Sequence, residues 1–415
     1  MADISINFAG IKSPNPFWLA SGPLTNTAYQ VMKAFDLGWG GAVWKTVGIP
    51  IVNVYSRYGG LTYHGNRLVG LNNNELITDR SYEENYKEIY QVKKKYPKNA
   101  LLVSLMFETK QEWKEHVKRA IDSGADGLEL NFGCPHGMCE RGMGSAVGQE
   151  PKVLKEVTSW VLEYSTVPVL VKLTPNISDI REPGMAAQEI GAHGVSLINT
   201  IKSIIGIDVD SFSPVPSVGG KGTNGGYCGP AVKPIALHMV GALSRMPGWK
   251  TLISGIGGIQ TWRDAVEFIL LGAASLQVCT AAMHYGFRIV EELNQGLSDY
   301  MDSKGFKTIE EFRGKAVKNY VEWGDLNLNY RVKAEINPKK CIECQLCVAA
   351  CDAGGHQCIH TSQNGTRVPY VDQEACIGCN LCSLVCPVED CITMKEIDLG
   401  KPYLTWREYQ KTAVS

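Results

Sequence analysis

Residues 1–330 alternate short apolar runs with longer segments in which apolar residues recur at helical spacing. The apolar runs predict β-strands at residues 17–22, 42–47, 100–106, 127–131, 167–173, 194–200, 251–257 and 275–280. The amphipathic segments predict helices, among them residues 81–96, 111–123, 151–164, 179–190 and 261–271. Eight strands alternating with roughly eight helices predict an α/β protein built on a (β/α)8 TIM barrel.

Most of the predicted strands end in a residue that an apolar core would not choose. These strand ends are Ser21-Gly22, Lys45-Thr46, Asn131, Lys172, Asn199-Thr200, Gly257-Gly258 and Thr280. In a barrel all of them meet on one face, where active sites are built. A doubly wound sheet is the alternative, and it would place its ligand groups at a single switch point. A strand that merely ends in water explains one polar end, but seven such ends favour the barrel.

The same cysteine spacing occurs twice near the C-terminus, as in two-cluster ferredoxins, where the fourth cysteine of each run ligates the other cluster. We therefore predict two [4Fe–4S] clusters. The first set is Cys341, Cys344, Cys347 and Cys386, and the second set is Cys376, Cys379, Cys382 and Cys351. Structural zinc is the alternative, but a zinc site usually uses one set of four residues. Such clusters transfer single electrons.

These patterns divide the chain into three parts. Residues 1–330 form the predicted barrel, residues 331–400 a small α+β ferredoxin-like domain, and residues 401–415 a C-terminal extension. Cysteines outside the cluster runs are expected to be buried thiols, namely Cys228, Cys279, Cys358 and Cys391, whereas the role of Cys139 stays open.

The overall composition is that of a soluble enzyme. The net charge is -1 and 20% of the residues are charged, with no basic block that would suggest nucleic acid. The first ten residues lack the pattern of a signal peptide, and no apolar run approaches the roughly 18 residues of a membrane span. Cluster cysteines favour a reducing compartment, so we expect a cytoplasmic protein.

A glycine-rich turn follows the seventh predicted strand. Gly257, Gly258 and Ile259 precede a predicted helix, and Gly229 precedes another. Glycine lets backbone N–H groups approach a phosphate, and in barrels the phosphate corner lies after strands seven and eight. No segment meets the dinucleotide fingerprint, so we expect no nicotinamide site in this chain.

A flavin is the expected cofactor of the barrel. Most organic reductions need two electrons, and a flavin exchanges them with carriers of single electrons. A barrel with a phosphate corner indicates FMN. Lys45 and Lys172 lie at strand ends, and either could stabilise negative charge on the reduced ring.

Cys134 lies just beyond the fourth predicted strand, on a glycine-rich loop. Its position above the barrel mouth favours an acid or base role, and a buried structural cysteine is the alternative. His136 is a rival acid, but Pro135 is expected to turn it away. Residues 137–148 contain four glycines and are expected to form a mobile lid over the substrate.

Asparagines occur at several places that the barrel brings together. Asn73 lies in an Asn-Asn-Asn run, and Asn131 and Asn199 end two strands. An amide both donates and accepts hydrogen bonds, so a pocket of amides suits a neutral, planar, amide-like ring. A turn or cap is the alternative for at least one residue of the run.

Together these residues resemble the catalytic half of the dihydropyrimidine dehydrogenase family. The resemblance covers nearly the whole chain. It is most specific at residues 131–144, Lys172-Leu173-Thr174-Pro175-Asn176, Ile198-Asn199-Thr200 and Leu276-Gln277-Val278-Cys279. It implies reversible reduction of the C5–C6 double bond of uracil or thymine. In the bacterial form a separate flavoprotein subunit carries FAD and the NAD(H) site, so it also implies such a partner in a heterotetramer.

The resemblance also implies individual roles. Cys134 would protonate the pyrimidine C5 while reduced FMN delivers hydride to C6. Substrate would be bound by Asn73, Asn131, Phe132, Gly133, Asn199 and Thr200. FMN would be bound by Ala20, Ser21, Lys45, Thr46, Lys172, Gly229, Gly257, Gly258, Ile259, Thr280 and Ala281.

Two other functions remain open. A dihydroorotate dehydrogenase-like enzyme shares the FMN barrel and the catalytic cysteine, but its substrate carries a carboxylate. Glu75 would repel orotate by a few kcal/mol at reduced dielectric, and the appended clusters also argue against this function. A non-catalytic electron carrier is the third candidate, and it predicts no substrate pocket.

Overall fold

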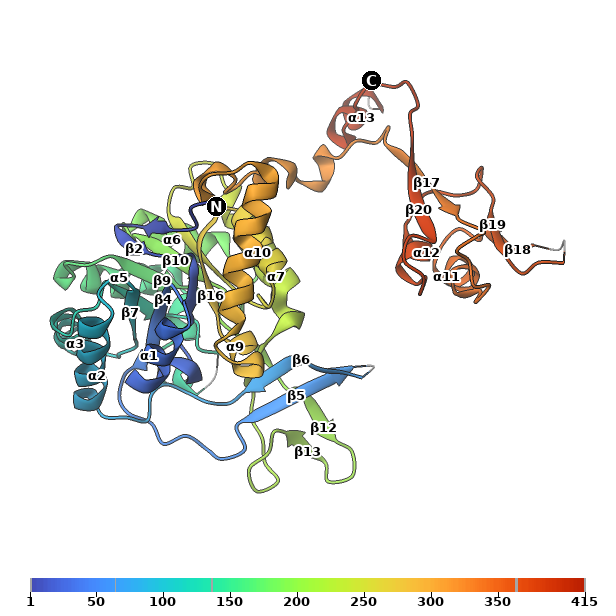
Figure 1. Ribbon diagram of the computed structural model, residues 1–415. Coiled ribbons are helices and arrows are strands. Elements are labelled where there is room, and N and C mark those ends of the chain that lie inside the picture. The colour runs from blue at the N-terminus through green and yellow to red at the C-terminus, as the bar shows by residue number, and fades with distance from the viewer. Residues whose placement is uncertain (1, 64, 136, 363–364, 414–415) are drawn as a thin grey trace. The chain divides into compact units, whose positions relative to one another are not determined.

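The computed structural model describes residues 2–63, 65–135, 137–362 and 365–413. Its contacts divide the chain into unit 1, residues 1–320, and unit 2, residues 321–415 (Figure 1). The division places residues 321–330 in unit 2, whereas the sequence prediction includes them in the barrel domain. This segment bonds to the chain end, since the Leu328 N–H donates to the Leu404 carbonyl at 2.7 Å.

Unit 1 is built around a closed barrel of eight parallel strands. In barrel order the strands are β3 (Phe17–Leu19), β4 (Gly41–Val47), β7 (Ala100–Leu105), β8 (Gly127–Asn131), β9 (Val169–Lys172), β10 (Gly194–Leu197), β15 (Leu252–Ile256) and β16 (Ala273–Val278). Each overlaps one predicted apolar run, so the predicted TIM barrel is confirmed.

Helices surround the barrel, as Figure 1 shows. They are α1 (Ala28–Asp36), α2 (Tyr82–Lys95), α3 (Lys110–Asp122), α5 (Pro151–Tyr164), α6 (Arg181–Glu189), α7 (Lys233–Ser244), α8 (Trp262–Leu270) and α10 (Ile289–Lys304). Capping boxes begin α2, α3 and α8 at Ser81, Thr109 and Thr261, where a side-chain oxygen accepts from an otherwise unpaired backbone N–H. The core lies between barrel and helices and includes the fully buried Trp44 and Phe268.

An N-terminal hairpin that the apolar pattern did not reveal covers one end of the barrel. It pairs β1 (Ile6–Phe8) with β2 (Ile11–Ser13) in antiparallel register. The ring of Phe8 lies against Gly194, the first residue of β10. The hairpin therefore closes the end of the barrel where the strands begin, and substrate access is left to the opposite end.

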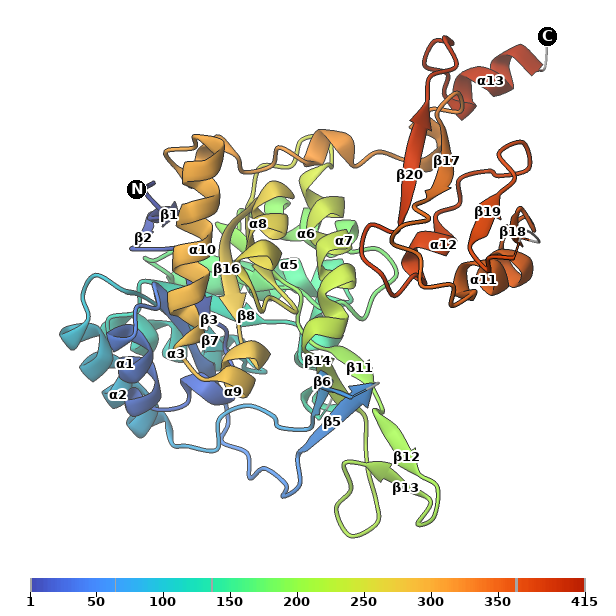
Figure 2. The ribbon, with the colours of Figure 1, turned by 45° about the vertical axis from the view of Figure 1, so that its right-hand side comes forward.

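Two excursions of the chain build a second sheet, here called the mouth sheet, at the end where the barrel strands finish. The first excursion follows β4 and carries β5 (Tyr58–Tyr63) and β6 (Asn66–Asn73). The second follows β10 and carries β11 (Ile201–Ser203) and β14 (Gly225–Cys228). The four strands pair in the order β11-β14-β6-β5, and Figure 2 shows them side by side. A further hairpin, β12 (Gly206–Asp208) with β13 (Ser213–Val215), extends from the second excursion.

Unit 2 is a small α+β domain. Its longest strands, β17 (Arg331–Ile336) and β20 (Ile392–Ile397), pair antiparallel, as do β18 (Ile359–Thr361) and β19 (Pro369–Val371). Its helices are α11 (Leu346–Gly354), α12 (Leu381–Leu384) and α13 (Trp406–Ala413). The buried core of this unit consists of Ala334, Ile359, Ile392 and five cysteines. Among the described helices, none has the length and apolar composition that a membrane crossing requires.

Candidate active site

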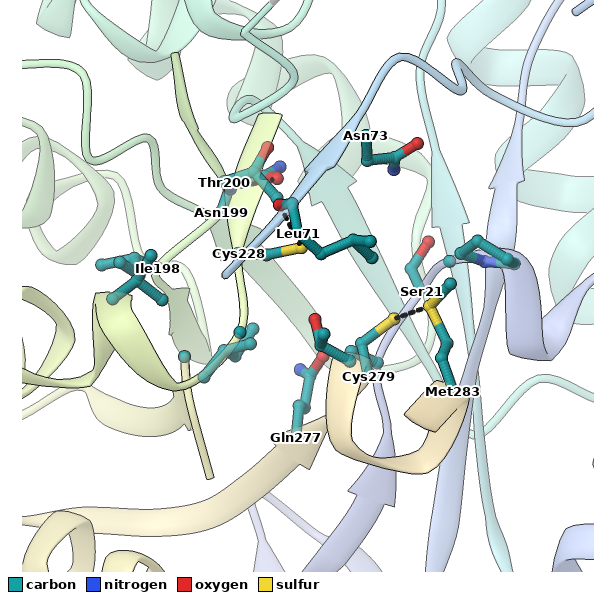
Figure 3. Close-up of a pocket in the computed structure, with 18 of the residues that line it drawn as sticks. Ser21, Leu71, Asn73, Ile198, Asn199, Thr200, Cys228, Gln277, Cys279 and Met283 are labelled. Atoms are coloured by element: carbon teal, nitrogen blue, oxygen red, sulfur yellow. Dashed lines mark hydrogen bonds between the residues drawn. The ribbon is translucent and has the colours of Figure 1, made fainter. Parts of the chain in front are cut away.

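A cavity opens at the carboxyl ends of the barrel strands, and most of the predicted site residues line it (Figure 3). Those present are Ala20, Ser21, Lys45, Thr46, Asn73, Asn131, Cys134, Lys172, Asn199, Thr200, Gly229, Gly257, Gly258, Ile259, Thr280 and Ala281. Phe132 and Gly133 do not line it. Phe132 packs edge-on against Trp113 in the core. A Cβ at Gly133 would lie 2.5 Å from the Asn199 side chain, so the glycine lets that amide approach.

The floor of the cavity is a buried polar network inside the barrel. Lys172 Nζ lies 3.6 Å from Oε1 of Glu129, whose side chain has no exposed surface. The other oxygen of Glu129 accepts from Ser196 Oγ at 2.7 Å and from Gln277 Nε2 at 2.8 Å. The Oε1 atom of Gln277 is buried without a hydrogen-bond partner. The sequence analysis did not single out Glu129, because a glutamate inside an apolar strand run gives no sign of which face it occupies.

A second buried ion pair lies at the side of the cavity. Lys45 pairs with Glu75, and the Tyr58 hydroxyl donates to the same carboxylate. Arg57 Nη1 lies 3.6 Å from Glu75 Oε1. Burial, together with the hydrogen bond to Glu75, raises the pKa of Tyr58 well above its usual value, so Tyr58 stays a neutral donor. Glu75 is therefore not an isolated negative charge, and the charge argument against an anionic substrate is weaker than the sequence suggests.

Amide side chains from different strands form a connected chain across the cavity. Asn199 Nδ2 donates to Asn131 Oδ1 at 3.1 Å, and Asn131 Nδ2 donates to Thr46 Oγ1 at 2.9 Å. Asn73 comes from β6 of the mouth sheet, and its Oδ1 accepts from the Glu75 N–H at 2.7 Å. The cavity is thus lined by amides that both donate and accept.

Cys134 lies beneath the segment that follows it. Its side chain is 8% exposed and belongs to an apolar cluster with Ile77, Met106, Met138 and Met143. This segment contains two short helices, η2 (Met138–Arg141) and α4 (Ser145–Gly148). The Ser145 N–H donates to the Cys134 carbonyl at 3.0 Å. Movement of residues 137–148 as a lid stays a prediction, and His136 lies outside the described residues.

The glycine corner brings two turns into close approach. Gly229 and Gly258 have φ values of +96° and +76°, a region that favours glycine. A Cβ at Gly258 would lie 3.0 Å from the Gly229 carbonyl and 2.8 Å from the Lys233 Cβ. The short helix α9 (Thr280–Tyr285) begins at the same cavity. Backbone N–H groups can reach a phosphate here, so the residues present fit FMN. The unpaired Oε1 of Gln277 is an acceptor for such a cofactor.

Two further thiols line this cavity, as Figure 3 shows. Burial raises the pKa of Cys228 to about 11 and that of Cys279 to about 12. Cys228 donates to the Leu71 carbonyl at 3.3 Å, and Cys279 Sγ lies 4.0 Å from the sulfur of Met283. Both are therefore neutral near pH 7, and neither is a nucleophilic thiolate.

The cluster cysteines of unit 2 line two separate cavities. One is lined by Cys341, Cys344, Cys347 and Cys386, the set assigned above to the first cluster, and also by Cys391. The other is lined by Cys351, Cys376, Cys379 and Cys382, the set assigned to the second cluster, and also by Cys358. Each cavity thus combines three cysteines of one sequence repeat with the last cysteine of the other.

In each cavity the cysteines line a volume and do not converge on a single point. Among the residues that the structure describes, no three His, Cys, Asp or Glu side chains are grouped so that they could hold a single metal ion. Tetrahedral zinc would bring four sulfurs to within about 3.8 Å of one another, because each Zn–S bond is about 2.3 Å long. A cavity lined by sulfurs fits an iron–sulfur cubane better than zinc.

Known proteins match both units. A family model described as dihydroorotate dehydrogenase matches residues 3–301, and one described as a 4Fe-4S dicluster domain matches residues 334–394. The chain is 44% identical over 401 residues to the NAD-dependent dihydropyrimidine dehydrogenase subunit PreA of Escherichia coli, which covers 96% of this chain and 97% of that one.

Two further relatives match over shorter lengths. The chloroplastic dihydropyrimidine dehydrogenase (NADP(+)) of Arabidopsis thaliana is 44% identical over 338 residues, covering 78% of this chain and 79% of that protein. The catalytic subunit of dihydroorotate dehydrogenase B (NAD(+)) from Pyrococcus abyssi is 38% identical over 319 residues, covering 76% of this chain and 99% of that subunit.

Proposed function

Because this chain belongs to the dihydroorotate dehydrogenase family and continues into a 4Fe-4S dicluster domain, we propose that it is the catalytic subunit of a dihydropyrimidine dehydrogenase. The observation that carries the proposal is the 44% identity to PreA, which extends over both units. The archaeal dihydroorotate dehydrogenase subunit is matched along 99% of its length by 76% of this chain. About a quarter of this chain therefore has no counterpart in that subunit.

The proposed reaction is the reversible reduction of the C5–C6 double bond of uracil or thymine. FMN, when bound, supplies the hydride that reaches C6 and exchanges single electrons with the clusters. Cys134 supplies the proton that C5 receives. This thiol lies at the cavity under residues 137–148, which exclude water from it. An acid shielded from water delivers its proton to substrate and not to solvent.

The amide chain is proposed to hold the pyrimidine ring. Uracil and thymine present alternating N–H donors and carbonyl acceptors, and an asparagine side chain can match either. Asn131, Asn199 and Thr200 come from barrel strand ends, while Asn73 approaches from the mouth sheet. The hydrogen bond between Asn199 and Asn131 holds the two amides next to each other, so both are proposed to face the same ring.

The cofactors are FMN in unit 1 and two [4Fe–4S] clusters in unit 2. Gly229, Gly257 and Gly258 are proposed to bind the FMN phosphate through backbone N–H groups. Lys172 is proposed to hold the charge of the reduced ring, with Glu129 holding the lysine in place. We propose that residues 331–400 form the cluster domain and that residues 401–415 form a C-terminal extension.

The relative's name describes a subunit, so this chain is one component of a larger enzyme. We propose that its partner is a flavoprotein subunit that carries FAD and the NAD(H) site, in a heterotetramer. Electrons would enter or leave through the clusters. The many cluster cysteines make the cytoplasm the proposed location, because thiols stay reduced there.

The proposal is tested by offering substrates to the reduced chain without its partner. The chain is reconstituted anaerobically with iron, sulfide and FMN, then reduced, and flavin absorbance is followed after addition of uracil, thymine or orotate. We expect uracil or thymine to reoxidise the flavin and orotate not to do so. Reoxidation by orotate alone would replace the proposal with a dihydroorotate dehydrogenase, which the paired state of Glu75 makes the second candidate.

A further inference from the structure

Each cluster cavity is lined by five cysteines, although a [4Fe–4S] cubane takes four thiolates. The fifth is Cys358 in the second cavity and Cys391 in the first. Both side chains are buried, at 4% and 3% exposure. Both belong to the apolar core of unit 2, and each also lines a cluster cavity together with four other cysteines.

The two extra cysteines lie at similar places in the two halves of the internal repeat, although their spacing differs. Cys358 is seven residues after Cys351, the last cysteine of the first run, and Cys391 is five residues after Cys386, the last of the second. Each is followed by an isoleucine that begins a strand, Ile359 in β18 and Ile392 in β20. The repeat therefore extends one cysteine beyond the spacing that predicts the clusters, and the fold uses the added position alike in both halves.

Cys358 touches the ligand that crosses over from the other repeat. Its Sγ lies 3.5 Å from the Sγ of Cys351, and its backbone N–H lies 3.4 Å from the same sulfur. It shares its cavity with Cys376, another member of that cluster's set. Cys391 shares the other cavity with Cys386 and Cys341 of the other cluster's set. Each extra thiol thus lines the same cavity as the assigned ligands of one cluster.

We propose that Cys358 and Cys391 are reserve ligands, each able to bind cluster iron in place of the neighbouring crossover ligand, Cys351 or Cys386. The proposal rests on the assignment of the two clusters made above. In the exchange, one Fe–S bond to Cys351 breaks and one to Cys358 forms. The proton of the Cys358 thiol passes to the released Cys351 sulfur, and no electron is transferred. The ligand is a cysteine thiolate both before and after the exchange.

Alanine variants separate a ligand with a reserve from a ligand without one. Cys351→Ala removes a ligand next to Cys358, whereas the matched control Cys379→Ala removes a ligand of the same cluster for which neither structure nor repeat supplies a substitute. The full chain is reconstituted, and iron and sulfide content and the EPR spectrum of the dithionite-reduced protein are measured. We expect Cys351→Ala to keep about eight irons per chain and both cluster signals. Cys379→Ala and the double variant Cys351→Ala/Cys358→Ala are expected to lose the second cluster's signal.

The outcomes distinguish a failure of the reserve role from a failure of the cluster assignment. If Cys351→Ala loses as much iron as Cys379→Ala, the reserve role is wrong while the cluster assignment stands. If the double variant keeps full iron, Cys351 is not a ligand, and both the reserve role and the assignment of the crossover ligand are wrong. If Cys379→Ala keeps full iron and an unchanged spectrum, the cluster assignment itself is wrong. Cys386→Ala, with and without Cys391→Ala, repeats the test at the other cavity, so a folding failure of one variant does not end it.

Discussion

The two units of this chain are held together by different means. Unit 1 buries a continuous apolar core that includes Trp18, Trp44 and Phe268. The core of unit 2 has eight buried residues, and five of these are cysteines that line the cluster cavities. Apolar burial stabilises unit 1 without any ligand. In unit 2 three of the eight buried residues, Cys347, Cys351 and Cys382, are proposed cluster ligands, so we expect folding and cluster binding to be coupled.

Removal of iron gives the largest expected effect. Anaerobic treatment with a chelator and oxidant should abolish protection from hydrogen exchange across β17 and β20, because their core loses the clusters that fill it. Protection in β8 and β16 of the barrel should persist. The measurement is hydrogen exchange with mass spectrometry on the treated and untreated chain. Equal loss of protection in both units would contradict the comparison.

Substitution of Cys134 is the next largest effect, and it separates function from stability inside unit 1. Cys134→Ala should lower turnover with uracil by about 10²–10⁴-fold, the usual contribution of a general acid. Steady-state assays measure it with uracil and an artificial electron donor, or in the reverse direction with dihydrouracil and an artificial electron acceptor. FMN and iron content must match the unchanged protein, since loss of cofactor would imitate the effect. Near-normal turnover in a fully loaded variant removes Cys134 from the acid role.

The two units also differ in how their structure could be predicted from the sequence. All eight barrel strands are found from apolar runs, because strands buried on both faces leave a continuous pattern. The cysteine runs of unit 2 indicate clusters by spacing alone. The mouth sheet was missed. Two of its strands are rich in glycine or asparagine, β6 (Asn66–Asn73) and β14 (Gly225–Cys228), and the pairing between these two joins segments more than 100 residues apart.

Site residues at the ends of barrel strands could be predicted from the sequence, whereas those positioned by the excursions could not. Side chains at strand ends, such as Lys172 and Asn199, could be placed at the cavity because the barrel brings those ends together. Tyr58 could not, because its position depends on the pairing of β5 with β6. The pairing of Glu75 with Lys45 was equally hidden, since 30 residues separate them and only the folded excursion brings them into contact.

Substitution of Glu129 tests whether the buried polar network of unit 1 influences the flavin potential. Glu129→Gln keeps the shape of the side chain but removes the negative charge beside Lys172. The lysine then interacts more strongly with a reduced, anionic flavin, so the flavin potential should rise. We expect about 30 mV, which corresponds to about 1.4 kcal/mol for a two-electron couple. Dye-linked potentiometry of the FMN-loaded chain measures it. Ser159→Ala, a change at a half-buried residue of α5 whose hydroxyl bonds to the Glu156 carbonyl, is the control and should leave the potential unchanged.

Acid gives the smallest expected effect and acts on unit 1. His116 on α3 stacks on Phe107 and bonds to the Tyr86 hydroxyl at 3.0 Å. Burial lowers the pKa of His116 to about 4, whereas an unfolded histidine titrates near 6.5. Between these values the unfolded state binds more protons. The stability that this neutral histidine contributes is therefore fully present above pH 6.5 and is lost as pH falls toward 4.

The variant His116→Gln isolates this contribution. Between pH 6.5 and 4.5 it should lose less stability than the unchanged protein, by about 2 kcal/mol. Urea unfolding followed by tryptophan fluorescence reports mainly on unit 1, because only Trp323 and Trp406 of the nine tryptophans lie in unit 2. An identical pH dependence in both proteins would mean that His116 titrates normally in the folded state.

The mouth sheet has a consequence for how this scaffold can acquire new substrates. It is assembled from two excursions, and one of them brings Asn73, Glu75 and Tyr58 to a cavity whose proposed acid, Cys134, is carried on a different loop. The residues at this side of the cavity are thus encoded apart from the residue proposed to donate the proton. Under the proposed function, changes within residues 48–79 alter selectivity without altering the proton donor.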